Sequence, residues 1–228
     1  MEKSVRDNVR EICARIEGAA KRAGRDPREV MLLAATKNRV PREILEAYEA
    51  GVKVVGENRV QEMVSKRSEV GDVVAWHFIG HLQRNKVRFV AGEVGLIHSV
   101  DSARLAEEID VRAGVRGTVQ PVLIQVNMAG EGSKFGLKPG QVGELIEEIA
   151  GYRNVEVRGL STVAPFVNDA EDVRWIFREL KDLGGRLDRD FDGFKCDELS
   201  MGMTNDFEIA VEEGSTLVRI GTAIFDLN

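Results

Sequence analysis

Lys37 is the residue whose place in the sequence points most directly to chemistry. It follows an apolar run at residues 30–36 that predicts a strand buried on both faces, so its stem is expected to leave a dry, crowded place. Burial and neighbouring cations lower the pKa of a lysine and make a neutral amine available. A neutral amine attacks an aldehyde to give a Schiff base. The alternative is an ordinary lysine at a strand end, with its amine in solvent.

Hydroxyl groups and glycines gather near the end of the chain. Ser200, Gly202, Gly221 and Thr222 lie at the ends of the last two predicted strands. Glycine lets the backbone approach an oxyanion closely, and the ends of the last two strands of a closed βα barrel frequently bind phosphate. The alternative is that these are ordinary turn residues. The chain has neither a Walker A motif nor a GxGxxG motif, which argues against a nucleotide bound through those motifs.

A metal site is not expected from the histidines and carboxylates. His77 and His81 have the i,i+4 spacing of a zinc-binding helix, but the segment HFIG predicts a strand followed by a turn. A core or hydrogen-bonding histidine explains them better. Only Glu57 lies obviously at a predicted strand end, whereas magnesium or calcium needs several carboxylate oxygens. The residue types therefore favour an anion site.

The elements that must position these residues alternate strictly between strand and helix. The predicted strands cover residues 30–36, 53–56, 77–80, 96–100, 121–127, 155–163, 198–201 and 217–225. Predicted helices lie at about 4–23, from 41, and over 58–68, 82–90, 103–112, 140–150, 170–183 and 206–213. Eight such units predict a (β/α)8 TIM barrel, with a doubly wound open sheet as the main rival. No linker or composition shift interrupts the chain, so we expect one domain over residues 1–228.

Composition narrows the classes of function. The 228 residues carry a formal net charge of −6, which argues against a general nucleic-acid binder. Cys13 and Cys196 form no CxxC pair or zinc spacing, and we expect two reduced, buried thiols. The N-terminal residues have no apolar region typical of a signal peptide, and no run is long enough to span a membrane. We therefore expect a cytoplasmic protein.

Several segments together resemble one family. The chain is similar to the YggS/PROSC family of pyridoxal-phosphate homeostasis proteins over about residues 5–226. The segments that carry this resemblance, in the family's order, are LLAATKNRVPREILEAYEAG, GENRVQE, WHFIGHLQRNK, GLSTVAP and LSMGMTNDFEIAVEEGSTLVRIGTAIF.

The resemblance implies a barrel like the N-terminal half of alanine racemase, without that enzyme's second domain. It implies that Lys37 holds pyridoxal 5′-phosphate as a Schiff base. It also implies roles for six further residues: Ser200, Gly221 and Thr222 at the phosphate, Met201 lining the ring pocket, Asn58 near the cofactor and Arg219 facing the pyridine nitrogen. Lys134 matches a lysine that the family often carries.

The implied constellation favours binding of the cofactor over catalysis. A protonated Arg219 at the pyridine nitrogen disfavours a second positive charge there, so the ring is a weak electron sink. A racemase also needs a second acid or base, and neither Tyr48 nor Tyr152 is obviously at the strand ends. We therefore expect a carrier or regulator that stores the cofactor or hands it over, with PLP-dependent apo-enzymes as candidate recipients. An amino-acid racemase, or an aldolase-like barrel acting on a sugar phosphate, is the alternative.

Overall fold

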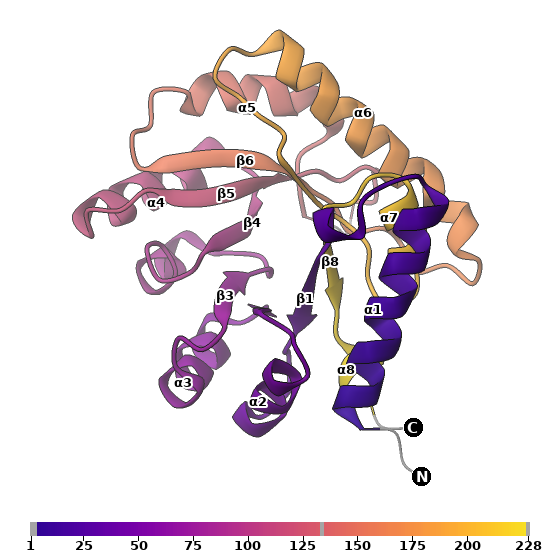
Figure 1. The fold of residues 1–228 in the computed structure, drawn as a ribbon. Coiled ribbons are helices and arrows are strands. Elements are labelled where there is room, and N and C mark those ends of the chain that lie inside the picture. Colours follow the sequence, from indigo (N-terminus) through magenta and orange to yellow (C-terminus); the bar gives the residue numbers. More distant parts are fainter. Residues whose placement is uncertain (1–3, 133–134, 227–228) are drawn as a thin grey trace.

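Eight parallel strands close into a barrel. The computed structural model describes residues 4–132 and 135–226. Each strand pairs with the next, and the last pairs with the first (Figure 1). The strands are β1 (Met31–Ala35), β2 (Val54–Glu57), β3 (Ala75–Phe78), β4 (Leu96–Val100), β5 (Gln120–Gln125), β6 (Val155–Ser161), β7 (Glu198–Ser200) and β8 (Leu217–Ile220). The predicted (β/α)8 barrel is confirmed, and the open sheet is excluded by the β1–β8 pairing.

Helices surround the barrel in the predicted order, with two differences. The α-helices are α1 (Val5–Arg22), α2 (Pro41–Glu49), α3 (Val60–Val70), α4 (Ala103–Val115), α5 (Val142–Ile149), α6 (Arg174–Asp190), α7 (Phe207–Glu212) and α8 (Thr222–Phe225). The helix predicted over 82–90 is a 3₁₀ helix, η2 (Arg84–Phe89), in which only Val87 is buried, too little for an amphipathic face. The last strand ends at Ile220, not 225, because the amides of Ile224 and Phe225 bond to the carbonyl of Gly221.

The barrel has an inner and an outer apolar layer. Alternate strand residues separate into two clusters, because successive side chains of a strand point to opposite faces. The inner cluster consists of Leu33, Val54, Leu96, Leu123 and Leu217, and the outer one packs the strands against the helices. The first strand was predicted to be buried along its whole length, but Met31 is 45% exposed. Full burial begins at Leu33, so only the half of β1 that leads towards Lys37 is enclosed.

The N-terminal helix α1 packs along α7 and α8 (Figure 1). Ser4 and Asp7 form a capping box at its start, with the Asp7 amide donating to Ser4 Oγ at 3.2 Å. Val9, Ile12 and Ile16 are among the residues that bury its apolar face. The expectation of two buried thiols was wrong for Cys13, which is exposed on the opposite face of this helix. Cys196 is partly exposed, and both cysteines are free.

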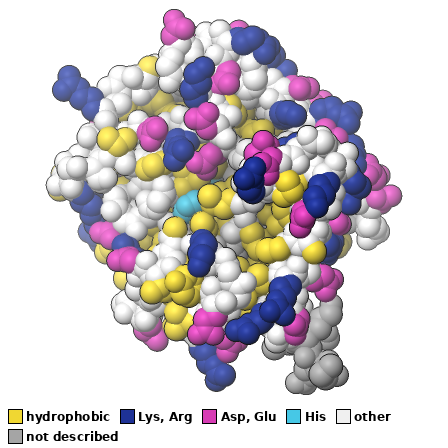
Figure 2. Space-filling view, in the orientation of Figure 1, with side chains coloured by type: hydrophobic (Ala, Val, Ile, Leu, Met, Phe, Trp, Pro, Cys, Tyr) yellow, Lys and Arg dark blue, Asp and Glu magenta, His cyan; other side chains and the backbone are white. Residues whose placement is uncertain are grey.

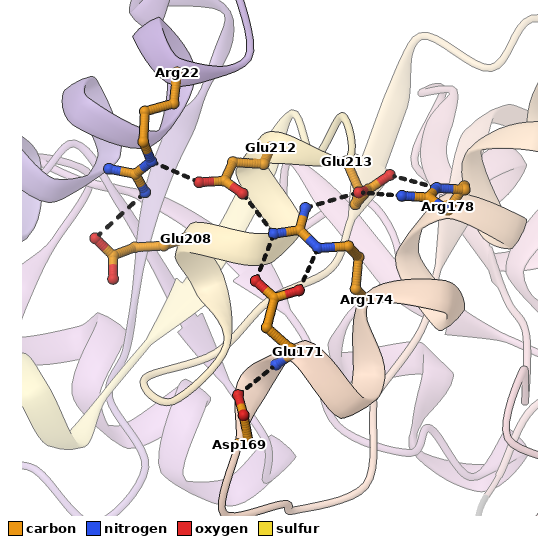
Figure 3. Close-up of polar contacts among 8 residues, drawn as sticks. All are labelled: Arg22, Asp169, Glu171, Arg174, Arg178, Glu208, Glu212 and Glu213. Carbon is orange, nitrogen blue, oxygen red and sulfur yellow. Dashed lines mark hydrogen bonds and ion pairs between the residues drawn. The ribbon is translucent and has the colours of Figure 1, made fainter.

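An ion-pair network joins α1, α6 and α7 on the outside of the barrel (Figure 3). Arg174 contacts Glu171 at 2.6 Å, Glu212 at 2.7 Å and Glu213 at 2.8 Å, and Arg22 contacts Glu212 at 2.7 Å. Networks of this kind hold their members more firmly than isolated surface pairs do. The arrangement ties the start of α6 to the end of α7. Both helices follow loops that line the cavity described below.

The surface carries charges of both signs. In Figure 2, lysine and arginine side chains are interspersed with aspartate and glutamate, and hydrophobic side chains gather towards the middle of the face in view. No helix among the described residues is both long and apolar enough to cross a membrane.

Candidate functional site

A cavity of about 630 Å³ opens at the carboxyl ends of the strands. Five of the seven residues predicted for the site line it: Lys37, Asn58, Arg219, Gly221 and Thr222. They come from the ends of β1, β2 and β8, which are neighbours in the barrel. Parallel strands in a closed barrel bring such residues to one face regardless of their separation in the chain.

Closure of the barrel brings the two ends of the sequence together at this cavity. Ala34 pairs with Ile220 in the β1–β8 ladder. One residue further on, the backbones are so close that a Cβ on Gly221 would lie 3.1 Å from the carbonyl oxygen of Ala35. Lys37 and Thr222 therefore leave adjacent strand ends. Glycine at 221 permits this approach because it has no side chain.

Lys37 itself lies in an exposed turn. The expectation that its stem leaves a dry, crowded place was wrong, because β1 ends at Ala35 and burial ends at Thr36. The next residue, Asn38, has a φ of 60°, a left-handed conformation that turns the chain sharply. Within the described part of the chain, the Lys37 amine makes no hydrogen bond or ion pair. It is therefore an accessible amine at the mouth of the cavity.

Asn58 lies at the next strand end, while its neighbour Glu57 does not face the cavity. Asn58 is exposed and follows β2, and a Cβ on Gly80 would clash with its backbone, so glycine at 80 permits this close packing. Glu57 was expected at the open face, yet it is fully buried and accepts a hydrogen bond of 2.6 Å from Thr36 Oγ1. Glu57 therefore contacts Thr36 behind the cavity wall and does not line the cavity.

Arg219 is a buried cation that reaches the cavity from β8. Its Nη1 donates to Ser200 Oγ at 2.7 Å and to the Ser200 carbonyl at 3.0 Å, and its Nη2 donates to the Thr162 carbonyl at 2.6 Å. Burial lowers the pKa of Arg219 to about 10, and the charge of Asp206 opposes this shift. The guanidinium therefore remains protonated at neutral pH.

Ser200 and Met201 lie deeper than the cavity wall. The Ser200 hydroxyl is fully buried and is shared between Arg219 and His98 Nδ1, the latter at 2.9 Å. Met201 packs in the outer hydrophobic cluster. The chain bends next at Gly202, whose φ is 94°. This bend brings residues 203–206 to the cavity instead.

Two of the three histidines, His77 and His98, form a buried pair. His77 Nδ1 lies 3.1 Å from His98 Nε2, and burial lowers the pKa of His77 to about 4 and that of His98 well below its usual value. His81 stacks instead on the exposed ring of Phe135. In the described ranges, no group of three or more His, Cys, Asp or Glu side chains could hold a metal.

Sequence reasoning missed part of the cavity wall. Asp206 lines it, is nearly buried and accepts a hydrogen bond of 2.6 Å from the Met203 amide, and burial raises its pKa. It is the first residue of the helix predicted over 206–213, and no role in the site was predicted for it. Arg39 and the loop at residues 163–167 also line the wall. Arg39 and residues 163–165 lie in segments that carry the family resemblance, but no role in the site was predicted for them. Lys134 lies outside the described residues.

Comparison with known proteins gives concordant matches over almost the whole chain. A family model described as "Alanine racemase, N-terminal domain" matches residues 4–228. The pyridoxal phosphate homeostasis protein of Aquifex aeolicus is 46% identical over 220 residues, which cover 96% of both chains.

Two solved structures have a fold similar to that of this chain. PipY of Synechococcus elongatus PCC7942, solved with PLP bound, superimposes with a TM-score of 0.81 at 34% identity, over 92% of this chain and 99% of that chain. An alanine racemase of Clostridium difficile superimposes with a TM-score of 0.75 at 15% identity, over 96% of this chain and 56% of that chain. The second match concerns the fold alone.

Proposed function

Because this chain belongs to the family of pyridoxal phosphate homeostasis proteins, we propose that it binds pyridoxal 5′-phosphate in the cavity between β1 and β8 and serves in vitamin B6 homeostasis. The observation that carries the proposal is the convergence of one accessible lysine amine, one buried guanidinium and the Gly221–Thr222 turn on a single cavity. The PLP-bound structure of a relative with the same fold supports it.

The cavity wall fits this cofactor. Pyridoxal phosphate supplies an aldehyde, which a lysine amine can hold covalently, and a phosphate group. The Lys37 amine at the cavity mouth has no other partner among residues 4–132 and 135–226, and Thr222 adds a hydroxyl beside the backbone of Gly221. Arg219 is proposed to face the ring nitrogen, and Asn58 to lie beside the ring.

Ser200 and Met201 act on the site from behind the wall in this proposal. The Ser200 hydroxyl holds the guanidinium of Arg219 and so fixes where its charge lies. Met201 fills the core beneath the bend at Gly202. Neither residue needs to touch the cofactor in order to affect its binding.

We propose a carrier or regulator, not a racemase. No tyrosine is found among the described residues that line the cavity: Tyr48 packs against the core near Lys53, and Tyr152 lies beyond α5. A protonated Arg219 at the ring nitrogen would also weaken carbanion stabilisation. PLP-dependent apo-enzymes are the proposed recipients of the cofactor. The two free cysteines support a cytoplasmic location.

Reductive trapping tests where the cofactor binds. Protein supplied with pyridoxal phosphate is treated with borohydride, and the modified peptide is identified by mass spectrometry. We expect the label on Lys37, its loss in Lys37→Ala, and wild-type labelling in Lys86→Ala, whose lysine lines a neighbouring cavity of about 230 Å³. The circular dichroism of Lys37→Ala should match that of the wild type, since an exposed side chain is removed. A label elsewhere would contradict the proposal.

Hydrogen exchange separates the carrier from the racemase. The loaded protein is incubated in deuterium oxide with a panel of amino acids, and incorporation at Cα is followed by nuclear magnetic resonance. We expect no exchange at catalytic rates. Sustained exchange that depends on Lys37 would establish the racemase alternative.

A further inference from the structure

A buried ion pair lies directly beneath the turn that carries Lys37. Lys66, on α3, donates to Glu57 Oε1, at the end of β2, at 2.7 Å. The side chain of Lys66 is 9% exposed and that of Glu57 is fully buried. A buried pair of this kind contributes little net stability, because the desolvation of two charges offsets much of their attraction. Its contacts with the surrounding chain indicate a different role.

These contacts hold the backbone on both sides of Lys37. Lys66 Nζ donates to the carbonyl of Thr36 at 2.8 Å, and the Thr36 hydroxyl donates to Glu57. Glu62, one turn earlier on α3, accepts from the amide of Asn38 at 3.2 Å and from Lys66 at 2.9 Å. The peptide groups before and after Lys37 are therefore both tied to one charged cluster.

The amines of Lys66 and Lys37 differ in their hydrogen bonds. An ammonium group has three hydrogens, and Lys66 uses them on three acceptors: the Thr36 carbonyl, Glu57 and Glu62. Lys66 is therefore fixed and enclosed. The amine of Lys37 is unbonded among the described residues and faces the cavity. The Asn58 amide adds a weak bond of 3.3 Å to Glu57, so a second residue at the cavity touches the same carboxylate.

We propose that Glu57 and Lys66, together with Glu62, are positioning residues that hold the turn at residues 36–38 so that the Lys37 amine points into the cavity. This inference rests on the proposed binding of pyridoxal phosphate at Lys37. Without the cluster, the Asn38 amide loses its bond to Glu62, and the Thr36 carbonyl keeps only the bond from the Arg39 amide within the turn, at 2.9 Å. The amine then samples positions from which it cannot reach the aldehyde.

The test neutralises the cluster without leaving a buried charge alone. The double variant Glu57→Gln with Lys66→Met removes both charges, because removal of one partner from a buried pair is strongly destabilising. A second variant, Glu62→Ala, keeps the buried Glu57–Lys66 pair and releases the Asn38 amide at a partly exposed position, together with the Glu62 contacts to Lys66 and Arg59. Arg67→Met is the matched control, since Arg67 is the next residue on α3 and pairs with Glu93 and Asp72, away from the turn.

Each protein is titrated with pyridoxal phosphate, and the absorbance of the lysine-bound cofactor gives the affinity and its pH dependence. We expect the double variant to bind about tenfold or more weakly and to shift the pH midpoint of the linkage, and Glu62→Ala to show a smaller loss, since an ångström of misplacement is costly to a covalent step. Arg67→Met should keep the wild-type affinity and midpoint even if its melting temperature falls.

The outcomes separate this inference from the proposed function. Wild-type affinity and pH midpoint in both the double variant and Glu62→Ala would overturn the positioning role while leaving Lys37 as the binding lysine. Failure of the wild type itself to bind pyridoxal phosphate would overturn the proposed function and, with it, the positioning role. If the double variant does not fold, Glu62→Ala decides, because it leaves the buried pair intact.

Discussion

The guanidinium of Arg219 lies 2.7 Å from the hydroxyl of Ser200 inside the barrel. The same hydroxyl contacts His98, which in turn contacts His77, so four polar side chains from four strands form one buried row. Both imidazoles stay neutral because burial lowers their pKa. The row ends at the cavity wall with Arg219, which is the one member of the row that is charged at neutral pH. A substitution at any residue of this row is therefore expected to alter the cavity wall at Arg219.

Ser200→Ala should weaken both the fold and the site. Removal of the hydroxyl leaves a donor of Arg219 and a nitrogen of His98 without a partner, which costs about 1–3 kcal/mol. We also expect a shift in the absorption spectrum of bound pyridoxal phosphate, because the guanidinium keeps its two backbone contacts but loses the hydroxyl that helps to fix its position. Ser215→Ala is the control: Ser215 is equally buried, but its hydroxyl bonds only to backbone carbonyls. It should lower stability and leave the spectrum unchanged.

Arg219→Glu should change how the bound cofactor titrates. A carboxylate at the ring nitrogen favours its protonation, whereas the guanidinium opposes it. We expect a different absorption maximum and a different pH dependence, measured by spectrophotometry from about pH 5 to pH 9. Arg219→Lys keeps the cation and should retain the wild-type response. Identical spectra for wild type and Arg219→Glu across this range would show that Arg219 does not face the ring.

His77 should make the fold sensitive to mild acid. Its pKa is about 4 in the folded protein, against a usual value of 6.5, because burial disfavours the charged form. Its contribution to stability is therefore complete above pH 6.5 and is lost as the pH falls towards 4, by about 3 kcal/mol. Denaturant unfolding of the wild type and of His77→Gln should show a shallower pH slope in the variant. His81→Gln, which removes an exposed imidazole, is the control. Equal slopes for wild type and His77→Gln would contradict this account.

Gly202→Ala should destabilise the bend between β7 and the cavity. Gly202 has a φ of 94°, and an added Cβ would lie 2.6 Å from the Cβ of Ala210 on α7. Overpacking together with an unfavourable backbone conformation is expected to cost about 1–3 kcal/mol, measured as a lower melting temperature. Gly140→Ala is the control, since nothing lies within 4 Å of the added carbon. A melting temperature equal to that of the wild type would show that the bend relaxes freely.

Much of this fold follows from local pattern. Short apolar strands alternating with amphipathic helices require parallel pairing, and eight units permit closure, so the barrel was predictable. The start of α1 was equally predictable, because Ser4 and Asp7 cap it through bonds within one turn. Residues at the strand ends of a barrel meet at one face, which indicated Lys37, Gly221 and Thr222, whereas the resemblance to the family added Asn58 and Arg219.

Tertiary packing decided the rest. The exposure of Lys37, the burial of Glu57 under it and the depth of Ser200 depend on how far each strand extends before the chain turns, and the residue types do not record this. Asp206 reaches the cavity because Gly202 bends the chain, and Lys66 reaches Thr36 across 30 residues of sequence. Such contacts join separate elements. The sequence by itself determined which elements form and in what order, whereas only the closed barrel determined which polar groups are enclosed with one another and which face the open cavity.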